Sequence, residues 1–296
     1  MPDILSLAGR TLFITGASRG IGLAIALRAA RDGANVAVIG KTAQAHAKLQ
    51  GTIHEAAAAI ERAGGRAIAI PCDIRDEAAV DQAVAATIAR FGTIDILVNN
   101  ASAIRLTGTF ATPPKRFDLM MDVNARGTFV TSRACLPHLL ESARQGRNPH
   151  ILTLSPPLDF RAKWFAPHVA YSLAKYGMSL VVLGLAEEFR GRGIAVNALW
   201  PRSVIATAAI AMIPGAQAQT ARMRRADIVA DAAHAMLLRD ARHYSGRFCV
   251  DEDVLREAGV VDFTQYAIDA AQPLLLDLFI DDPAVMPEAS TSPSGH

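Results

Sequence analysis

Short runs of apolar, largely β-branched residues alternate along the chain with longer segments of helical composition. The runs are TLFIT (residues 11–15), NVAVIG (35–40), RAIAIPC (66–72), IDILVNN (94–100), HILTLS (150–155), IAVNALW (194–200) and RFCV (247–250). The first six are almost continuously apolar, as expected for strands of a parallel sheet that is covered on both faces. Helices are predicted between them over residues 21–31, 52–63, 77–90, 115–141 and 169–190.

This alternation predicts an α/β fold, a single doubly wound Rossmann domain of about seven parallel strands with helices on both faces. No repeat and no strong linker divides the sequence, so we expect one domain over residues 6–282. Residues 283–296 are rich in Pro, Ser, Thr and Gly and are predicted to form a disordered tail.

Composition narrows the class of protein. The chain is 51% apolar and carries a net charge of +2, which gives no support for binding nucleic acid or a membrane surface. Three widely spaced cysteines, Cys72, Cys135 and Cys249, indicate neither a disulfide framework nor a metal site. We see no signal peptide and no apolar stretch approaching the ~20 residues of a membrane span, so we expect a cytoplasmic protein.

A glycine-rich turn follows the first predicted strand. In TGASRGIG (residues 15–22), Gly16, Gly20 and Gly22 allow a tight turn and a close approach of backbone to a ligand. The helix that begins near Ile21 directs free N–H groups and its positive dipole end at this turn, which suits a pyrophosphate. A plain strand-to-helix turn is the alternative, but the position before the first helix of an α/β pattern favours nucleotide binding.

The end of the second strand indicates which dinucleotide binds. NAD-binding proteins commonly place an acid there for the ribose 2′-OH. This chain has Gly40 and Lys41 instead, and Arg19 lies in the glycine turn. Two cations favour the 2′-phosphate of NADP over NAD, unless Lys41 is only a solvated loop lysine. Asp73, after the third strand, is placed to accept a hydrogen bond from the adenine amino group or to cap the next helix, for which Asp76 is the better candidate.

Tyr171 and Lys175 stand four residues apart in YSLAK and share one face of a predicted helix. An ammonium at this spacing lowers the pKa of a phenol by favouring the phenolate, which would make Tyr171 a useful proton donor and acceptor. The spacing alone occurs often by chance, so this pair gains meaning only from the other motifs.

Five motifs occur in one order: TGASRGIG, NNAS (residues 99–102), VNARG (123–127), LSPP with Ser155, and YSLAK. In this order they resemble the short-chain dehydrogenase/reductase family, of the compact type, over about residues 6–265. Stretches such as DLMMDVNARGTF resemble the subgroup of hydroxysteroid dehydrogenase-like proteins. Longer members of that subgroup carry a sterol-carrier domain after the reductase, which we do not expect here.

The resemblance implies a hydride transfer between NADP(H) and the alcohol or carbonyl carbon of a small molecule. It implies Tyr171 as the general acid/base, Lys175 as the group that tunes it and holds the nicotinamide ribose, Ser155 on the substrate oxygen, and Asn124 on a relay water. The implied cofactor contacts are Gly16, Ser18, Arg19, Gly20, Ile21, Gly22, Lys41, Asp73, Ile74, Asn100, Ala101, Ser102, Tyr171, Lys175, Pro201 and Val204.

Two departures from the family pattern stand out. Ser155 precedes Tyr171 by sixteen residues, more than is usual, so the extra residues either bulge away or move the serine. After the sixth strand the chain reads PRSVIAT, with Arg202 in place of glycine and Thr207 one position late. The Val204 N–H can still meet the nicotinamide carboxamide. Arg202 can meet an acidic substrate group or only solvent.

Mostly apolar residues in 160–167 and 204–214 are expected to wall the pocket, which favours a lipid-, terpenoid- or steroid-like substrate unless they are ordinary packing. The Tyr171 helix is apolar on almost every face, so we expect a homodimer or homotetramer. Two alternatives stay open, a 3-oxoacyl thioester reductase and a catalytically silent NADP-binding sensor or adaptor. The set of Asn124, Ser155, Tyr171 and Lys175 argues against the silent protein.

Overall fold

The computed structural model describes residues 6–44 and 51–281, so the predicted tail and residue 282 lie outside the described residues. Its centre is one parallel sheet in the order β3-β2-β1-β4-β5-β6-β7. The strands are β1 (Thr11–Thr15), β2 (Asn35–Gly40), β3 (Arg66–Pro71), β4 (Ile96–Asn99), β5 (His150–Leu154), β6 (Ala195–Trp200) and β7 (Phe248–Val250). The predicted fold class is confirmed, and each predicted strand is present within two residues of its expected ends.

The strand order reverses beside β1. From β1 the chain runs outward to β2 and β3, and it then returns to place β4 on the other side of β1, pairing Leu12 with Ile96 and Ile14 with Val98. Ligands of doubly wound sheets bind at such a reversal, outside the carboxyl ends of the strands. The fold therefore presents its binding edge where β1 and β4 end.

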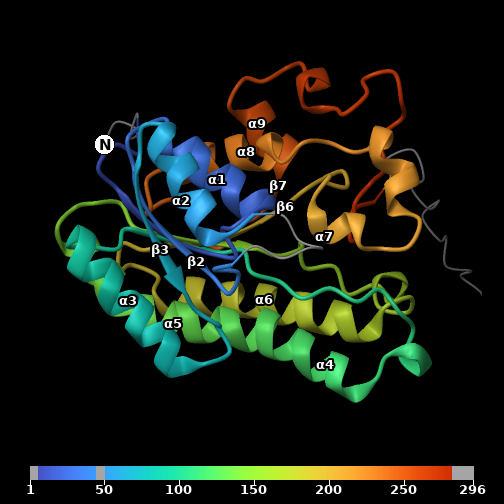
Figure 1. Ribbon diagram of the computed structural model, residues 1–296, viewed down its shortest axis with the longest axis horizontal. Helices are drawn as coiled ribbons and strands as arrows, with labels where there is room; N and C mark the ends of the chain where they lie inside the picture. Colours follow the sequence, from blue (N-terminus) through green and yellow to red (C-terminus); the bar gives the residue numbers. More distant parts are fainter. Residues whose placement is uncertain (1–5, 45–50, 282–296) are drawn as a thin grey trace, which may run out of the picture.

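Helices cover both faces of the sheet (Figure 1). On one side lie α1 (Gly20–Ala30), α2 (Ile53–Arg62), α8 (Asp227–Leu237) and α9 (Asp251–Glu257), and on the other α3 (Glu77–Phe91), α4 (Pro114–Met120), α5 (Gly127–Arg144) and α6 (Val169–Glu188). Two separate apolar clusters fill these layers, one containing Ile25 and Ile228 and the other containing Leu139 and Val182. Burial on both faces explains why the strands are almost continuously apolar.

The predicted helix over residues 115–141 is interrupted. Between α4 and α5 the chain forms a π-helical turn, η2 (Met121–Arg126), which contains the buried Asn124. Single π-helical turns inside α-helices frequently lie at functional sites. An apolar pattern does not reveal one extra residue in a turn, so the sequence predicted a continuous helix. It also left α7 (Ala208–Ala211), α8 and α9 unassigned.

Helix α6 is a longer apolar stretch than we expected in any segment of this chain. We expected no apolar stretch of membrane-spanning length, but α6 has 20 residues and a mean hydropathy of 1.5. Of that stretch, 61% is buried inside the protein, as in the core helix of a globular fold. Its remaining face exposes Leu173, Leu180 and Leu183, each between 44% and 50%.

Candidate functional site

The four residues implied in catalysis lie close to the carboxyl ends of the central strands. Ser155 follows β5, Tyr171 and Lys175 lie on α6, and Asn124 lies on η2, against which α6 packs. That packing is close, since a Cβ added at Gly177 of α6 would stand 2.7 Å from the Cβ of Ala125. All four side chains are buried.

Lys175 is fixed by three groups. Its Nζ donates to the Leu154 carbonyl oxygen at 2.6 Å, lies 3.3 Å from Met178 Sδ, and stands 4.9 Å from the centre of the Trp200 ring. Burial disfavours the charged form and lowers the pKa of Lys175 to about 7, although the Asp277 carboxylate opposes this shift. The amine therefore changes its charge near neutral pH.

The pKa of Tyr171 shifts in the opposite direction to the sequence prediction. Burial raises this pKa above its ordinary value, and the negative charge of Asp277 raises it further. The lowering of this pKa that we expected from Lys175 is not seen in this conformation, in which the Lys175 amine contacts the Leu154 carbonyl and the Trp200 ring. Tyr171 is consequently held as a neutral phenol that can donate its proton.

Ser155 keeps its place despite the long spacing to Tyr171. The carbonyl of Leu154 before it accepts from Lys175, and the carbonyl of Pro156 after it accepts from Ser179 Oγ at 2.7 Å. Since both neighbours are tied to α6, the extra residues bulge away after Pro156. The hydroxyl of Ser155 is fully buried and has no hydrogen-bond partner among the described residues. An orphaned buried hydroxyl of this kind requires an explanation, and a substrate oxygen supplies one.

Asn124 ties η2 to the loop after β4. Its Oδ1 accepts from the Ala103 N–H at 2.7 Å, and its Nδ2 donates to the Ala103 carbonyl at 3.0 Å. These two hydrogen bonds attach the loop that contains the end of the NNAS motif to η2, against which α6 packs. Asn124 is therefore more than a polar residue on a helix surface.

The glycine turn forms a cradle with no room for side chains. A Cβ added at Gly22 would stand 2.5 Å from Asn100 Nδ2, and one added at Gly16 would stand 2.9 Å from Ala101 Cα. Asn100 Nδ2 donates to the Thr15 and Gly16 carbonyls at 2.9 and 3.1 Å. Gly16 and Gly20 also have φ values of +67° and +57°, where glycine is favoured. This tight turn at the start of α1 fits the pyrophosphate of a dinucleotide.

Other predicted cofactor residues surround this cradle. Ser18 is buried in the turn, and Arg19 donates to the Gly51 carbonyl at 2.6 Å. Ile21 lies in the first turn of α1, and Ile74 lies against Gly127 at the start of α5. The remaining members are placed at strand ends, with Ala101 half-buried, Ser102 exposed and Pro201 buried.

Lys41 and Asp73 meet at the ends of β2 and β3. Lys41 Nζ lies 3.0 Å from Asp73 Oδ2, and Arg75 Nη2 lies 2.6 Å from the same oxygen. Arg75 does most to hold the pKa of Asp73 well below its usual range, and Lys41 adds to this. Asp76 caps α3, as predicted, by accepting from the Ala79 N–H. Sequence reasoning missed Arg75, a further cation at this edge.

In the segment after β6, the backbone N–H groups have different partners from those that we expected. The Val204 N–H donates to the Leu275 carbonyl at 2.9 Å, so it is not available for a carboxamide in this conformation. Ile205 forms a parallel bridge with Arg224 through the Val204 carbonyl and the Ala206 N–H. In such a bridge the N–H of the central residue, here Ile205, points away from the segment that contains Arg224. Of the N–H groups in this segment, that of Val204 is therefore bound to Leu275 and that of Ala206 to Arg224.

Thr207 and Arg202 also have identifiable contacts in the structure. The methyl group of Thr207 would stand 3.4 Å from a Cβ added at Gly20. Thr207 therefore reaches the glycine turn, although it stands one position later than the threonine of the family pattern. Arg202 is paired with Glu252 at 3.3 Å and with Asp253 at 2.7 Å. The charge of Arg202 is thus balanced by two acidic residues of this protein. Neither a free cation for an acidic substrate group nor a contact with solvent alone is observed.

We predicted no role for the segment that runs along this site. Residues 275–280 run beside the chain that follows β6, with Leu276 bridged to Ser203. They bring the Phe279 ring to 6.4 Å from the Tyr171 ring, centre to centre. The apolar stretch PLLLDLFI was visible as a signal, but nothing in its pattern indicated which part of the fold it would cover.

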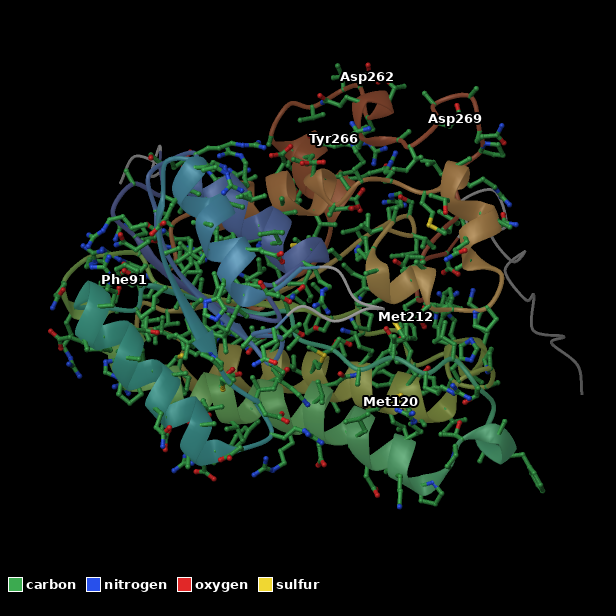
Figure 2. All side chains as sticks on the ribbon, viewed as in Figure 1. Phe91, Met120, Met212, Asp262, Tyr266 and Asp269 are labelled. Atoms are coloured by element: carbon green, nitrogen blue, oxygen red, sulfur yellow. The ribbon has the colours of Figure 1, made fainter. Side chains whose placement is uncertain are left out.

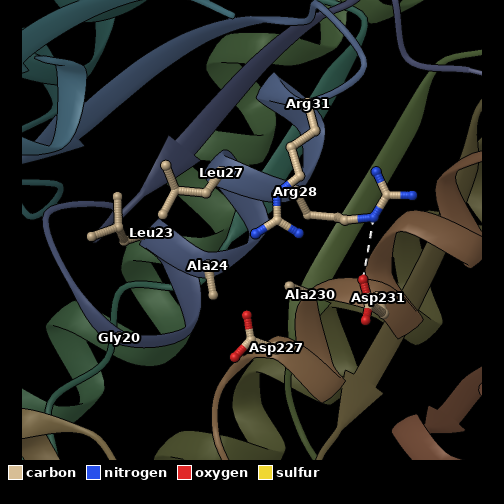
Figure 3. Close-up of a pocket in the computed structure, with 9 residues that line it drawn as sticks. All are labelled: Gly20, Leu23, Ala24, Leu27, Arg28, Arg31, Asp227, Ala230 and Asp231. Atoms are coloured by element: carbon tan, nitrogen blue, oxygen red, sulfur yellow. Dashed lines mark ion pairs between the residues drawn. The ribbon is translucent and has the colours of Figure 1, made fainter. Parts of the chain in front are cut away.

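A separate cavity of about 160 Å³ lies between α1 and α8 (Figure 3). Arg28 and Asp231 form an ion pair of 3.2 Å at its edge. The cavity reaches Gly20 but none of the four residues implied in catalysis. Its lining consists of Gly20, Leu23, Ala24, Leu27, Arg28, Arg31, Asp227, Ala230 and Asp231.

Comparisons with known proteins agree with the motif order. The family model of the short chain dehydrogenases matches residues 10–216. Hydroxysteroid dehydrogenase-like protein 2 of Danio rerio is 55% identical over 275 residues, which are 93% of this chain and 65% of that protein. The chain thus spans about two thirds of the length of most such curated relatives, and 54% of the one from Rattus norvegicus.

Solved structures agree in the fold. A Xanthomonas campestris protein is 61% identical with a TM-score of 0.90, and the match covers 94% of this chain and 100% of that one. A short chain dehydrogenase of Burkholderia cenocepacia in complex with NADP is 33% identical, with a TM-score of 0.70 and coverages of 82% and 96%. One from Mycobacterium paratuberculosis bound to NAD is 23% identical, with a TM-score of 0.69 and coverages of 85% and 99%.

Proposed function

Because the chain belongs to the short-chain dehydrogenase family, we propose that it transfers a hydride between NADP(H) and the alcohol or carbonyl carbon of an apolar substrate. The observation that carries this proposal is the buried, unpartnered hydroxyl of Ser155 at the end of β5. It lies next in the chain to the carbonyl that holds Lys175, in a site that also contains the phenol of Tyr171.

The glycine cradle supports the cofactor part of the proposal. A backbone turn without room for a Cβ at Gly16 and Gly22, at the start of a helix, suits a pyrophosphate. Lys41 and Arg75 share the single carboxylate of Asp73, which leaves a net positive charge at the ends of β2 and β3, where a ribose 2′-phosphate would lie. When bound, the dinucleotide supplies or accepts the hydride, and the protein has to supply the proton.

The proton chemistry is assigned to Tyr171. In the direction of reduction, the neutral phenol donates its proton to the carbonyl oxygen while Ser155 Oγ donates a hydrogen bond to the same oxygen. Lys175 stabilises the phenolate that results whenever its own amine is protonated, which its pKa near 7 permits. Asn124 holds the loop after β4 in place and is proposed to position a water that returns a proton to Lys175.

An apolar substrate is supported by the side chains beside Tyr171. Trp164, Phe165 and Phe279 pack around Tyr171 and Tyr176 in one cluster. The 3-oxoacyl thioester alternative is less supported, because Arg202, one of the basic residues that could serve such a substrate, is already paired with Glu252 and Asp253. A silent NADP-binding adaptor would leave the orphaned Ser155 hydroxyl unexplained.

The exposed apolar side chains of α4, α5 and α6 support a homo-oligomer. Phe117, Phe129, Leu173, Leu180 and Leu183 are 37% to 51% exposed and lie on three helices of the same layer. A symmetric contact between two copies of this face would cover them. We therefore propose a homodimer or a higher homo-oligomer built on this layer, in a protein that acts in the cytoplasm.

The proposed activity predicts NADPH consumption with apolar aldehydes and ketones. A panel of alkanals, cyclic ketones, sugars and acetoacetyl thioesters, followed at the NADPH absorbance, should give its highest kcat/KM with an apolar aldehyde or ketone. A preference for the thioester would favour the alternative reductase. No turnover of any member, with NADPH bound, would favour the silent protein.

The cofactor assignment predicts that Lys41→Asp reverses the nucleotide preference. Losing one charge-assisted bond to the 2′-phosphate costs about tenfold in kcat/KM for NADPH, and the new carboxylate should favour the 2′-OH of NADH. Lys115→Asp, at an exposed position on α4, serves as the matched control. If both variants keep the wild-type ratio of NADPH to NADH activity, Lys41 does not read the 2′ position.

The assembly proposal predicts that Leu180→Arg separates the subunits. An arginine in the centre of an apolar contact is costly to bury, so sedimentation velocity should show wild type as a dimer or larger species and the variant as a monomer. Val261→Arg alters an exposed apolar residue outside this layer, 93% exposed, and should leave the oligomer intact. A monomeric wild-type protein would contradict the proposal.

A further inference from the structure

Residues 275–281, here named the C-terminal strap, are fastened along the edge of the site. The Leu275 carbonyl accepts from the Val204 N–H, and the Asp277 N–H donates to the Arg202 carbonyl at 3.0 Å. Trp200 Nε1 donates to the Leu278 carbonyl at 2.7 Å. The strap is thus anchored to the last residue of β6 and to the segment that follows it.

The far end of the strap is held on the opposite side. Asp281 forms ion pairs with Arg161 and Lys163, which belong to the long loop between β5 and α6. The strap therefore spans from the segment after β6 to the loop before α6, and its Phe279 packs in one cluster with Tyr171. Between its two attachments stands Phe279.

Phe279 is inserted into a set of aromatic side chains. Its ring centre lies 6.1 Å from that of Trp164, 6.4 Å from Tyr171, 5.3 Å from Tyr176 and 5.8 Å from Trp200. The side chain is only 4% exposed. Its φ of +67° lies in the left-handed region that bulky residues rarely adopt, so the attachments on both sides hold it there against its own preference.

The position of Phe279 decides what can approach the reacting groups. Tyr171 is 5% exposed and Ser155 is fully buried, so a carbonyl that meets both has to come against the side chains that cover them. The rings of Phe279 and Tyr171 are nearly parallel, at 22°. A slim methylene chain can enter beside a flat ring after a small rotation of that ring, whereas a branched or cyclic group has to displace it.

We propose that Phe279 is a specificity-determining residue that selects substrates with an unbranched chain next to the reacting carbon. This inference rests on the proposed oxidoreductase function and adds the substrate class that the site takes. In this proposal the strap supplies the wall, and the chain would lie beside it in a slot flanked by Trp164 and Trp200, whose ring centres lie 6.1 and 5.8 Å from that of Phe279.

The test compares Phe279→Ala with wild type on two aldehydes of equal carbon number, heptanal and cyclohexanecarbaldehyde, with NADPH. Wild type should prefer heptanal. In the variant the ratio of kcat/KM for the cyclic over the linear aldehyde should rise about tenfold or more, the range that a changed apolar wall produces. Phe279→Trp should lower the ratio, and Phe279→Leu should give an intermediate value if the alanine variant fails to fold.

The control is Phe91→Ala, which removes a half-buried phenylalanine at the end of α3. Figure 2 shows Phe91 at the far end of the view from Met120, which belongs to the same cluster as Tyr171 and Phe279. This variant should keep the wild-type ratio. An unchanged ratio in the folded Phe279 variants would overturn the proposal while leaving the oxidoreductase function standing.

A second readout does not depend on turnover. Trp164 and Trp200 are the two tryptophans of the chain, and both contact Phe279, so intrinsic fluorescence reports on ligands in the slot. Titrating the cofactor-free protein with heptan-1-ol and with cyclohexylmethanol gives a ratio of Kd values, which should shift in the Phe279→Ala variant toward the cyclic alcohol. If the Kd ratio shifts in the Phe279→Ala variant but no substrate is turned over, the proposed oxidoreductase function is wrong. The selection of ligands by the strap is then supported. Equal Kd ratios in both proteins would count against the strap.

Discussion

The burial of the Lys175 amine between a backbone carbonyl and an indole ring is the interaction on which the site depends. A cationic group out of water is tolerated only where it is hydrogen-bonded or otherwise compensated. Here the Leu154 carbonyl comes from β5, the Trp200 ring from β6, and the lysine from α6. The C-terminal strap holds Trp200 through its indole N–H. Three elements and the strap must therefore be correctly placed before the amine is satisfied, and Ser155 directly follows the carbonyl that holds it.

Desolvation, together with the charge of Asp277, sets the acidity of Tyr171 and raises its pKa. A fully buried group can shift by several pKa units, each of which corresponds to about 1.4 kcal/mol. The resulting neutral phenol is suited to donating a proton to a carbonyl. For the reverse reaction the phenolate has to be favoured by an added positive charge, which a protonated Lys175 and an oxidised nicotinamide would both supply. The lowered pKa of Lys175 makes that balance sensitive to pH near neutrality.

Much of the fold and part of the site could be predicted from the sequence because they depend on local pattern. Short apolar runs located all seven strands, and the glycine spacing located the turn that has no room for a Cβ at Gly16 and Gly22. The misses arise from relations between distant residues. The engagement of Val204 by Leu275, the pairing of Arg202 with an acidic helix start, and the seat of Phe279 against Tyr171 join segments that no local pattern connects. The raised pKa of Tyr171 was missed for the same reason, because burial is a property of the whole fold.

The central claim is that the phenol of Tyr171 carries the proton that accompanies hydride transfer. Tyr171→Phe removes one oxygen and keeps the ring that packs against Phe279, so folding and nucleotide affinity should be preserved. Measured together, NADPH binding by fluorescence should stay within about twofold of wild type, and kcat with the best aldehyde should fall by a factor of 10²–10⁴, the usual contribution of a positioned general acid. Unchanged turnover in a variant that binds NADPH normally would contradict the account.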